Sequence, residues 1–110
     1  MGGDHIICAD NLDVLPGLPD RSFRLIYTDP PFNTGRRQSR PDGGAYEDRF
    51  DDYLAYLEPR LRHAHRLLDD AGTLYLHVDY REAHYCKVLL DEIFGRAAFL
   101  NEIIWAYDYG

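Results

Sequence analysis

The residues best suited to chemistry in this sequence are the four consecutive residues Asp29, Pro30, Pro31 and Phe32. Each proline fixes its own φ at about −65° and keeps the preceding residue out of the helical region, so the backbone after Asp29 is predicted to be stiff and extended. The Asp29 carboxylate and the Pro30 carbonyl could then accept both hydrogens of a planar amine, and the Phe32 ring could stack on a flat partner. This combination suits the amino group of a nucleobase. A bare Asp-Pro-Pro is more often only a turn, so the surrounding elements decide between the two interpretations.

Three apolar runs of the kind that buried strands show are each followed directly by an aspartate. The runs are His5–Ala9, Phe23–Thr28 and Thr73–Val78, and the aspartates are Asp10, Asp29 and Asp79. A fourth apolar run, Phe99–Tyr107, predicts another strand. Helical patterns separate the strands, and this alternation is typical of an α/β fold with an open parallel sheet and helices on both faces. Such sheets bind ligands beyond the carboxyl ends of their strands, which is where the three aspartates fall.

The helices are predicted from apolar residues that recur at steps of three and four. The longest pattern runs from Phe50 to Leu68, and a short helical segment follows Asp10. Proline lacks an N–H and clashes with the preceding turn, so Pro59 is expected to kink the long helix or to start a second one. A third helix ends at Gly95, and its predicted buried residues are Ala83, Cys86, Leu89 or Leu90, and Ile93.

Residues Asn33–Asp48 carry three glycines, one proline and three arginines but no apolar periodicity. This composition predicts a mobile surface loop, and loops of this length are often functional. Arg36, Arg37 and Arg40 could contact phosphates, because the loop follows the Asp-Pro-Pro segment. A charge run in a loop is as often only solvated, so both interpretations stay open.

Other pairs of polar residues carry weaker predictions. His63 and His65 point to different sides of a helix, so no metal site is predicted there. His77 and Asp79 share a strand face and could mimic part of a hydrolase triad, but no serine nucleophile elbow accompanies them. Asp79 is better explained, together with Glu82, as a capping box at the start of the following helix.

Composition bounds the class of protein. A length of 110 residues with 45% hydrophobic residues suits one small domain. The formal net charge of −7 repels nucleic-acid phosphates, so a grip on DNA needs a local basic patch or another segment of chain. Cys8 and Cys86 are predicted to be reduced core residues, which favours the interior of the cell. No leader opens the chain and no window nears the roughly 18 apolar residues of a membrane helix, so a soluble protein is expected.

Five blocks of the sequence resemble the DNA amino-methyltransferases, whose signature is Asp, Asn or Ser, then Pro-Pro, then an aromatic residue at the end of a central strand. The blocks are Ala9–Leu12, Thr28–Gly35, Gly72–Tyr75, Lys87–Gly95 and Asn101–Trp105. They are most similar to the permuted, beta-type group, which includes the modification subunits of type III restriction systems. The resemblance implies part of a Rossmann-like S-adenosylmethionine-dependent methyltransferase fold.

The resemblance also implies a reaction. The enzyme would flip a base, usually adenine, out of double-stranded DNA and methylate its exocyclic N6 with S-adenosylmethionine. Asp29 and the Pro30 carbonyl would hold the amine, Pro31 would keep the segment rigid, and Phe32 would stack on the base. Asp10 would accept a hydrogen bond from the cofactor's adenine amino group. The expected cofactor contacts are Asp10, Asn11 and Asp29. An acid in the first position favours adenine N6, whereas Ser favours cytosine N4, so N4-cytosine methylation is the alternative.

The sequence departs from the family in two respects. It lacks the Phe-x-Gly-x-Gly loop that lies under the methionine part of the cofactor, and it lacks a target-recognition region. Residues 1–110 are therefore expected to be the N-terminal part of the catalytic domain and to be inactive alone. The family's sheet order places two strands from the absent part between the first and second strands of this chain.

Two further hypotheses remain for the role of the chain. It could be a truncated, non-catalytic module of a restriction-modification complex, or half of a split enzyme whose cofactor loop comes from a second polypeptide. In each case the expected partner is DNA in the cytoplasm and not a membrane, with a restriction endonuclease subunit and a second copy of the chain as further candidates.

Overall fold

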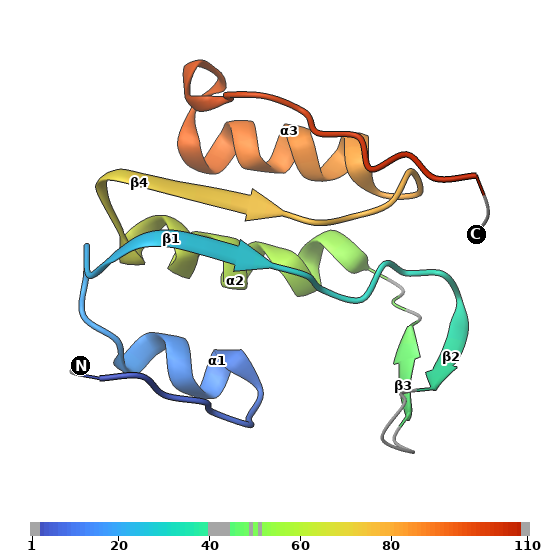
Figure 1. The fold of residues 1–110 in the computed structure, drawn as a ribbon, viewed down its shortest axis with the longest axis horizontal. Helices are drawn as coiled ribbons and strands as arrows, with labels where there is room; N and C mark the ends of the chain where they lie inside the picture. Colours follow the sequence, from blue (N-terminus) through green and yellow to red (C-terminus); the bar gives the residue numbers. More distant parts are fainter. Residues whose placement is uncertain (1–2, 40–44, 49, 51, 109–110) are drawn as a thin grey trace.

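The computed structural model describes residues 3–39, 45–48, 50 and 52–108 (Figure 1). The helices are α1 (Asn11–Val14), α2 (Tyr53–Leu67) and α3 (Ala83–Phe94), with two 3-10 helices, η1 (Leu15–Gly17) and η2 (Arg96–Ala98). The strands are β1 (Phe23–Thr28), β2 (Arg36–Ser39), β3 (Ala45–Asp48) and β4 (Leu68–Leu76). β1 and β4 form a parallel pair, and β2 and β3 form an antiparallel pair. The predicted α/β class with a parallel sheet is confirmed in this small form.

From Leu25 onward, β1 pairs with β4 without a shift up to the carboxyl ends of both strands. Thr28 pairs with Leu76, and the His77 amide donates to the Thr28 carbonyl with an N···O distance of 2.9 Å. β1 has the bounds that its apolar run predicts. Asp29 therefore follows the last paired residue of the strand directly, at the edge where parallel strands present ligand-binding groups.

β4 begins earlier than the predicted strand Thr73–Val78. It starts at Leu68, directly after α2, because Leu68 pairs with Phe23 of β1. The register then shifts, and Thr73 pairs with Leu25. The predicted strand corresponds to the regular part of this ladder up to Leu76.

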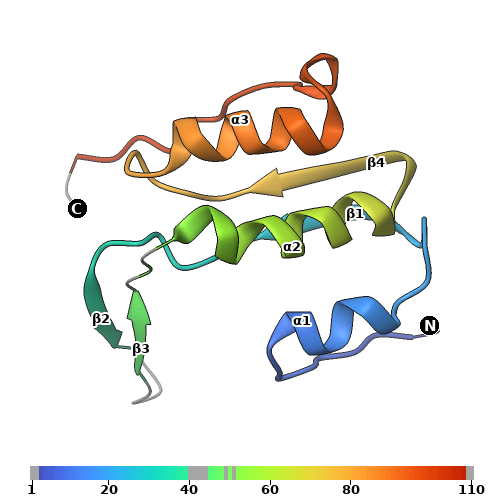
Figure 2. The same ribbon diagram turned by 180° about the vertical axis from the view of Figure 1, so that it is seen from behind.

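α2 covers one face of the β1–β4 sheet, and α3 packs against α2 (Figures 1 and 2). Buried residues on α2 recur at the predicted steps of three and four, because one side of the helix faces the strands. The core cluster comprises Tyr53, Leu57, Leu61, Cys86 and Leu89. Leu74, Leu76 and Val78 of the β4 region, and Leu90 and Ile93 of α3, pack against this cluster. Burial of each large apolar side chain contributes about 1.5–3 kcal/mol.

Pro59 neither ends nor divides α2. The helix runs unbroken from Tyr53 to Leu67 with Pro59 on its exposed side, so the prediction of a second helix starting there is wrong. Leu57 and Leu61 on either side of the proline are each only 2% exposed. Their burial offsets the hydrogen bond that a proline cannot donate.

α3 begins without the predicted capping box. The Asp79 side chain accepts a hydrogen bond from the Arg81 backbone amide (3.0 Å), and the Glu82 side chain caps no backbone amide. The Glu82 carboxylate instead accepts from the Asn33 side-chain amide (3.0 Å). The capping-box prediction is wrong because both carboxylates bind other donors. α3 ends before Gly95 as predicted, at a φ of 91° that glycine adopts without strain.

Two predicted strands are wrong. Residues 5–9 and 99–107 have no strand conformation. Their large apolar side chains are exposed: Ile6, Ile7, Phe99, Leu100, Ile103, Ile104, Trp105 and Tyr107. A strand needs a neighbour for its backbone N–H and C=O groups, and within the described ranges β1 and β4 pair only with each other.

The predicted helices on both faces of the sheet are found on one face only. Leu25, Tyr27 and Tyr75 project from the face opposite α2 and are 59%, 59% and 46% exposed. In the part of the chain that the structure describes, no helix lies over the face of the β1–β4 sheet opposite α2 (Figure 1).

The segment after the Asp-Pro-Pro residues contains a hairpin of two strands. Arg36 lies opposite Asp48, and Ser39 lies opposite Ala45. The prediction of a loop throughout 33–48 is wrong for these strands, because antiparallel pairing satisfies backbone groups without an apolar pattern. Arg40 lies outside the described residues.

The two cysteines differ in environment. Both are free, Cys86 is buried as predicted, and Cys8 is exposed. The prediction of a core position for Cys8 is wrong because residues 5–9 are not covered. Burial, with a smaller contribution from the Glu82 charge, raises the pKa of the Cys86 thiol to about 11. None of the described helices is long and apolar enough to cross a membrane.

Candidate functional site

Asp29 presents a carboxylate at the carboxyl end of β1. Its side chain is 55% exposed, and its Oδ1 lies 3.7 Å from Nδ1 of His77. Pro30, Pro31 and Phe32 follow, each half-buried. A charged acceptor thus stands at the rim of the sheet, next to a segment that two prolines stiffen.

The segment after Asp29 is anchored from the helical side. Tyr53 is 3% exposed, and its hydroxyl donates to the Pro31 carbonyl. The Asn33 side chain accepts from the Phe50 amide (2.9 Å) and donates to Glu82 (3.0 Å). Asn33 has a φ of 64°, in the left-handed region that asparagine tolerates better than most residues. These bonds connect the segment to the beginnings of α2 and α3.

Four rings gather beside Asp29. The Phe32 and His77 ring centroids are 5.3 Å apart, and the Trp105 ring stacks on His77 at 6.3 Å with an interplanar angle of 18°. The Tyr27 hydroxyl and His77 Nδ1 are 2.7 Å apart, which is a hydrogen bond. Phe32 is therefore supported on one side while its ring remains half-exposed.

Asp10 and Asn11 lie at the beginning of α1 and contact Arg60 of α2. The Asp10 carboxylate accepts from the Leu12 amide and from Arg60 Nη2, both at 3.0 Å. The Asn11 side-chain oxygen accepts from Arg60 Nε (2.8 Å). The Leu12 hydrogen bond, and next to it the Arg60 charge, hold the pKa of Asp10 below its usual value.

The predicted site residues form two groups that are attached to different elements. Asp29 to Phe32 contact His77, which follows β4, and Tyr53 at the beginning of α2. Asp10 and Asn11 contact the middle of α2 through Arg60. The Asp10 side chain is 57% exposed, so its carboxylate can accept further hydrogen bonds from a ligand.

A protein-family model described as DNA methylase matches residues 23–110, which include Asp29 to Phe32 and every element from β1 onward. The chain belongs to this DNA methylase family. The predicted family is thereby confirmed.

The relatives of this chain include type II methyltransferases and type III restriction-modification Mod subunits. It is 36% identical over 107 residues to Type II methyltransferase M.KpnI of Klebsiella pneumoniae, covering 90% of this chain and 26% of that protein. It is 40% identical over 101 residues to the probable type III restriction-modification enzyme HindVI Mod subunit of Haemophilus influenzae, covering 87% and 13%. It is 28% identical over 103 residues to DNA adenine methyltransferase YhdJ of Escherichia coli, covering 94% and 33%. The chain thus spans a third or less of each of these relatives.

Sequence reasoning did not assign several residues that contact the two groups of predicted site residues. Tyr53 was predicted only as part of the helical pattern from Phe50 to Leu68, Asn33 only as the start of a loop, and Arg60 carried no prediction of its own. Arg60 is 12% exposed, donates to the Tyr56 carbonyl (2.6 Å) and lies 3.9 Å from the Tyr56 ring centre. The one available signal is a charged residue, Arg60, four positions after a tyrosine on a helix with a buried face.

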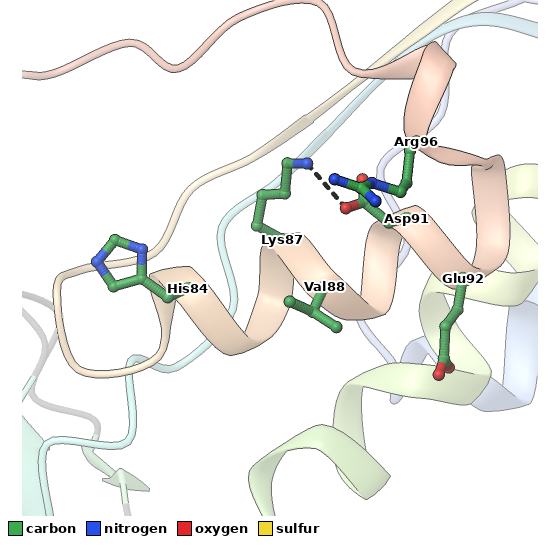
Figure 3. A pocket seen from close by; sticks show the side chains of 6 residues that line it. All are labelled: His84, Lys87, Val88, Asp91, Glu92 and Arg96. Atoms are coloured by element: carbon green, nitrogen blue, oxygen red, sulfur yellow. Dashed lines mark hydrogen bonds and ion pairs between the residues drawn. The ribbon is translucent and has the colours of Figure 1, made fainter.

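A hollow on the outer side of α3 contains none of the predicted site residues (Figure 3). It is lined by His84, Lys87, Val88, Asp91, Glu92 and Arg96. Lys87 and Asp91 form an ion pair inside it (2.8 Å), so its charges are partly matched internally. Among the described residues, no group of three or more His, Cys, Asp or Glu side chains could hold a metal ion.

Proposed function

We propose that this methylase chain is the catalytic-motif portion of an enzyme that methylates the exocyclic N6 of an adenine flipped out of double-stranded DNA. The observation that carries the proposal is the exposed Asp29 carboxylate at the carboxyl end of β1, followed by a rigid segment and an aromatic ring. Asp29 and the Pro30 carbonyl hold the two amine hydrogens. The neighbouring Pro31 carbonyl is already bound by Tyr53, which favours Pro30 as the second acceptor.

Positioning accounts for most of the catalysis in this proposal. The amine nitrogen must present its lone pair to the methyl donor, and two acceptors in one plane orient it. Phe32 stacks on the flipped base, which needs a flat ring with one open face. Pro31 contributes by restricting the backbone between the acceptor and the ring.

S-adenosylmethionine supplies the methyl group. Asp10 fits a contact with the cofactor's adenine amine, because its exposed carboxylate retains acceptor capacity after binding Leu12 and Arg60. Asn11 lies next to Asp10. Its side-chain oxygen accepts from Arg60, so the group that it can offer to the cofactor is its NH2 donor. Asp29 is proposed to contact both the base and the cofactor.

DNA is the proposed macromolecular partner. The matching family, described as DNA methylase, and the relative named as a DNA adenine methyltransferase support this substrate. Arg36 and Arg37 on β2 follow the site directly and offer positive charge in a chain of net charge −7. A restriction endonuclease subunit and a second copy of the chain are proposed as further partners in the cytoplasm.

The remaining sheet is proposed to come from a longer chain. The exposed face that bears Leu25 and Tyr27, together with the small share of each relative that the chain covers, supports a Rossmann-like domain of which residues 1–110 are the N-terminal part. A substrate amine on cytosine has the same hydrogen-bonding pattern, and the relative named as a DNA adenine methyltransferase favours adenine.

The test uses the full natural protein, S-adenosylmethionine with a labelled methyl group and plasmid DNA lacking methylation. Digestion of the product to nucleosides and chromatography should show label in N6-methyladenine. Label in N4-methylcytosine would transfer the assignment to the alternative base, and label in neither would contradict the proposed reaction.

A further inference from the structure

Among the described residues, His77 contacts both Asp29, the predicted amine acceptor, and Phe32, the predicted stacking ring. Its Nδ1 lies 3.7 Å from Asp29 Oδ1, and its ring centroid lies 5.3 Å from that of Phe32 with a tilt of 42°. Asp29 and Phe32 are separated by two prolines. In the proposed function Asp29 binds the amine of the base and Phe32 stacks on its ring. A residue that contacts both can therefore determine how far apart they stand.

The backbone of His77 is fixed relative to Asp29. Its amide donates to the Thr28 carbonyl at 2.9 Å, one position before Asp29. This bond extends the β1–β4 ladder by one residue beyond Leu76. The backbone position of His77 is therefore set by the end of β1 and not by a separate loop.

The His77 ring is also restricted in rotation. Tyr27 Oη lies 2.7 Å from Nδ1, in a hydrogen bond whose donor depends on the imidazole tautomer. Trp105 stacks on the ring at 6.3 Å and 18°, and the Tyr27 ring meets it edge-on at 6.2 Å. With a side chain 36% exposed, His77 is held by neighbours on several sides.

The separation between Nδ1 and Asp29 excludes a direct hydrogen bond. At 3.7 Å the two side chains lie close together without a hydrogen bond. The ring occupies the space beside the carboxylate, so it limits the rotamers that Asp29 can adopt. It occupies the space against Phe32 in the same way, so it limits the tilt of that ring.

We propose that His77, held by Tyr27, is a positioning residue that sets the orientation of the Asp29 carboxylate and the Phe32 ring toward the flipped base. This inference rests on the proposed function. It gives His77, the residue directly after β4, a role in base positioning that the Asp-Pro-Pro segment does not provide by itself. His77 acts through its two neighbours and does not itself contact the reacting atoms.

The test compares variants of the full natural protein in steady-state methylation of DNA. His77→Ala should lower kcat by about 10- to 100-fold, because a displacement of about 1 Å in a reacting group costs about 100-fold. The KM for S-adenosylmethionine should change less than kcat, since two of the three proposed cofactor contacts, Asp10 and Asn11, are bound to Arg60 and not to His77. Tyr27→Phe should lower kcat by about 2- to 12-fold, which corresponds to the loss of one hydrogen bond.

Two amide substitutions separate positioning from simple packing. His77→Asn places its amide near the position of Nδ1 and should recover most of the kcat lost in His77→Ala. His77→Gln places its amide one bond farther out and should not. His65→Ala is the matched control, because His65 also contacts one aromatic ring, that of Phe94 at 4.8 Å, and should retain the wild-type kcat.

The fluorescence of 2-aminopurine at the target base reports the flipped state independently of turnover. It should fall in His77→Ala and recover in His77→Asn. An unchanged kcat in His77→Ala, or an equal loss in the Ala, Asn and Gln variants with a lowered melting temperature, overturns the inference. Asp29→Ala, measured in parallel, must be inactive. If it retains more than about a tenth of the wild-type kcat, which would mean a loss of less than about 1.4 kcal/mol of transition-state stabilisation, the proposed function of the site is wrong as well.

Discussion

Asn33 should control the rigidity of the segment that carries Asp29 and Phe32. Its side chain forms hydrogen bonds of 2.9 Å with the Phe50 amide and 3.0 Å with Glu82. Removing both bonds in Asn33→Ala should cost about 1–3 kcal/mol. The φ of 64° adds about 1 kcal/mol in an alanine, because its Cβ is disfavoured in the left-handed region.

A comparison with Asn33→Gly separates the two contributions. Glycine also loses both hydrogen bonds but adopts a φ of 64° without a steric penalty. The free energy of local opening should therefore decrease in the order wild type, Gly variant, Ala variant, with about 1 kcal/mol between the two variants. Asn101→Ala is a suitable control, because the Asn101 side chain is exposed and accepts only from the adjacent Glu102 amide among the hydrogen bonds described here.

Hydrogen exchange of the Phe50 amide measures this effect directly, because Asn33 is its acceptor. In the full natural protein, a loss of 1–3 kcal/mol corresponds to exchange about 5- to 150-fold faster in Asn33→Gly, and faster again in Asn33→Ala. Methylation should slow in the same order. Unchanged Phe50 exchange in the alanine variant would refute the role of Asn33 as an anchor.

The remaining predictions concern stacking, thiol reactivity and the predicted cofactor contact. Phe32→Tyr should keep base flipping whereas Phe32→Ala should lose about 1–3 kcal/mol of stacking, and equal 2-aminopurine fluorescence in both variants would contradict stacking by this ring. At pH 8 a thiol reagent should modify Cys8 and spare Cys86, whose pKa of about 11 leaves about 100-fold less thiolate than an ordinary thiol. Because that pKa is raised, only the unfolded thiol loses its proton between about pH 9 and about pH 11, so the free energy of unfolding should decline over this range. Rapid labelling of Cys86, or a free energy of unfolding that does not change with pH over this range, would count against its burial. Arg60→Met should raise the pKa of Asp10 toward its usual value, as followed by carboxyl NMR titration. Since the pKa of Asp10 is lowered in the folded state, its stabilising contribution is present above the usual value and is lost as pH falls through the lowered one; an unchanged titration would exclude the Arg60 contact.

Local patterns predicted the elements that have a pairing or packing partner among the described residues. The apolar run of β1 and the helix-ending Gly95 are recognisable from a few consecutive residues, and the periodic face of α2 survived the proline inside it. The runs at 5–9 and 99–107 have equally apolar patterns, but a strand requires a paired neighbour, which the pattern does not reveal. Pairing is non-local, so periodicity alone overpredicts strands.

The candidate site shows the same division. Asp29 to Phe32 were recognisable because the four residues are consecutive. The residues that hold this site in place lie far away in the sequence: Tyr53 is 22 positions from its partner Pro31, and His77 is 50 positions from its partner Tyr27. Such contacts follow from the way β1, β4 and α2 meet. No pattern of neighbouring residues in the sequence predicts these contacts, apart from the polar type of the side chains involved.

The measurement that tests the central claim most directly is the single-turnover rate of methyl transfer by Asp29→Ala in the full natural protein. Asp70→Ala serves as the control, because Asp70 is an exposed aspartate near the opposite end of β4 that pairs only with Arg21 in the described contacts. If Asp29 holds the substrate amine, its alanine variant should fold as wild type by circular dichroism and transfer no measurable methyl group, while Asp70→Ala keeps the wild-type rate. A rate in Asp29→Ala within about tenfold of wild type, equivalent to less than about 1.4 kcal/mol, would contradict the claim that this carboxylate holds the base.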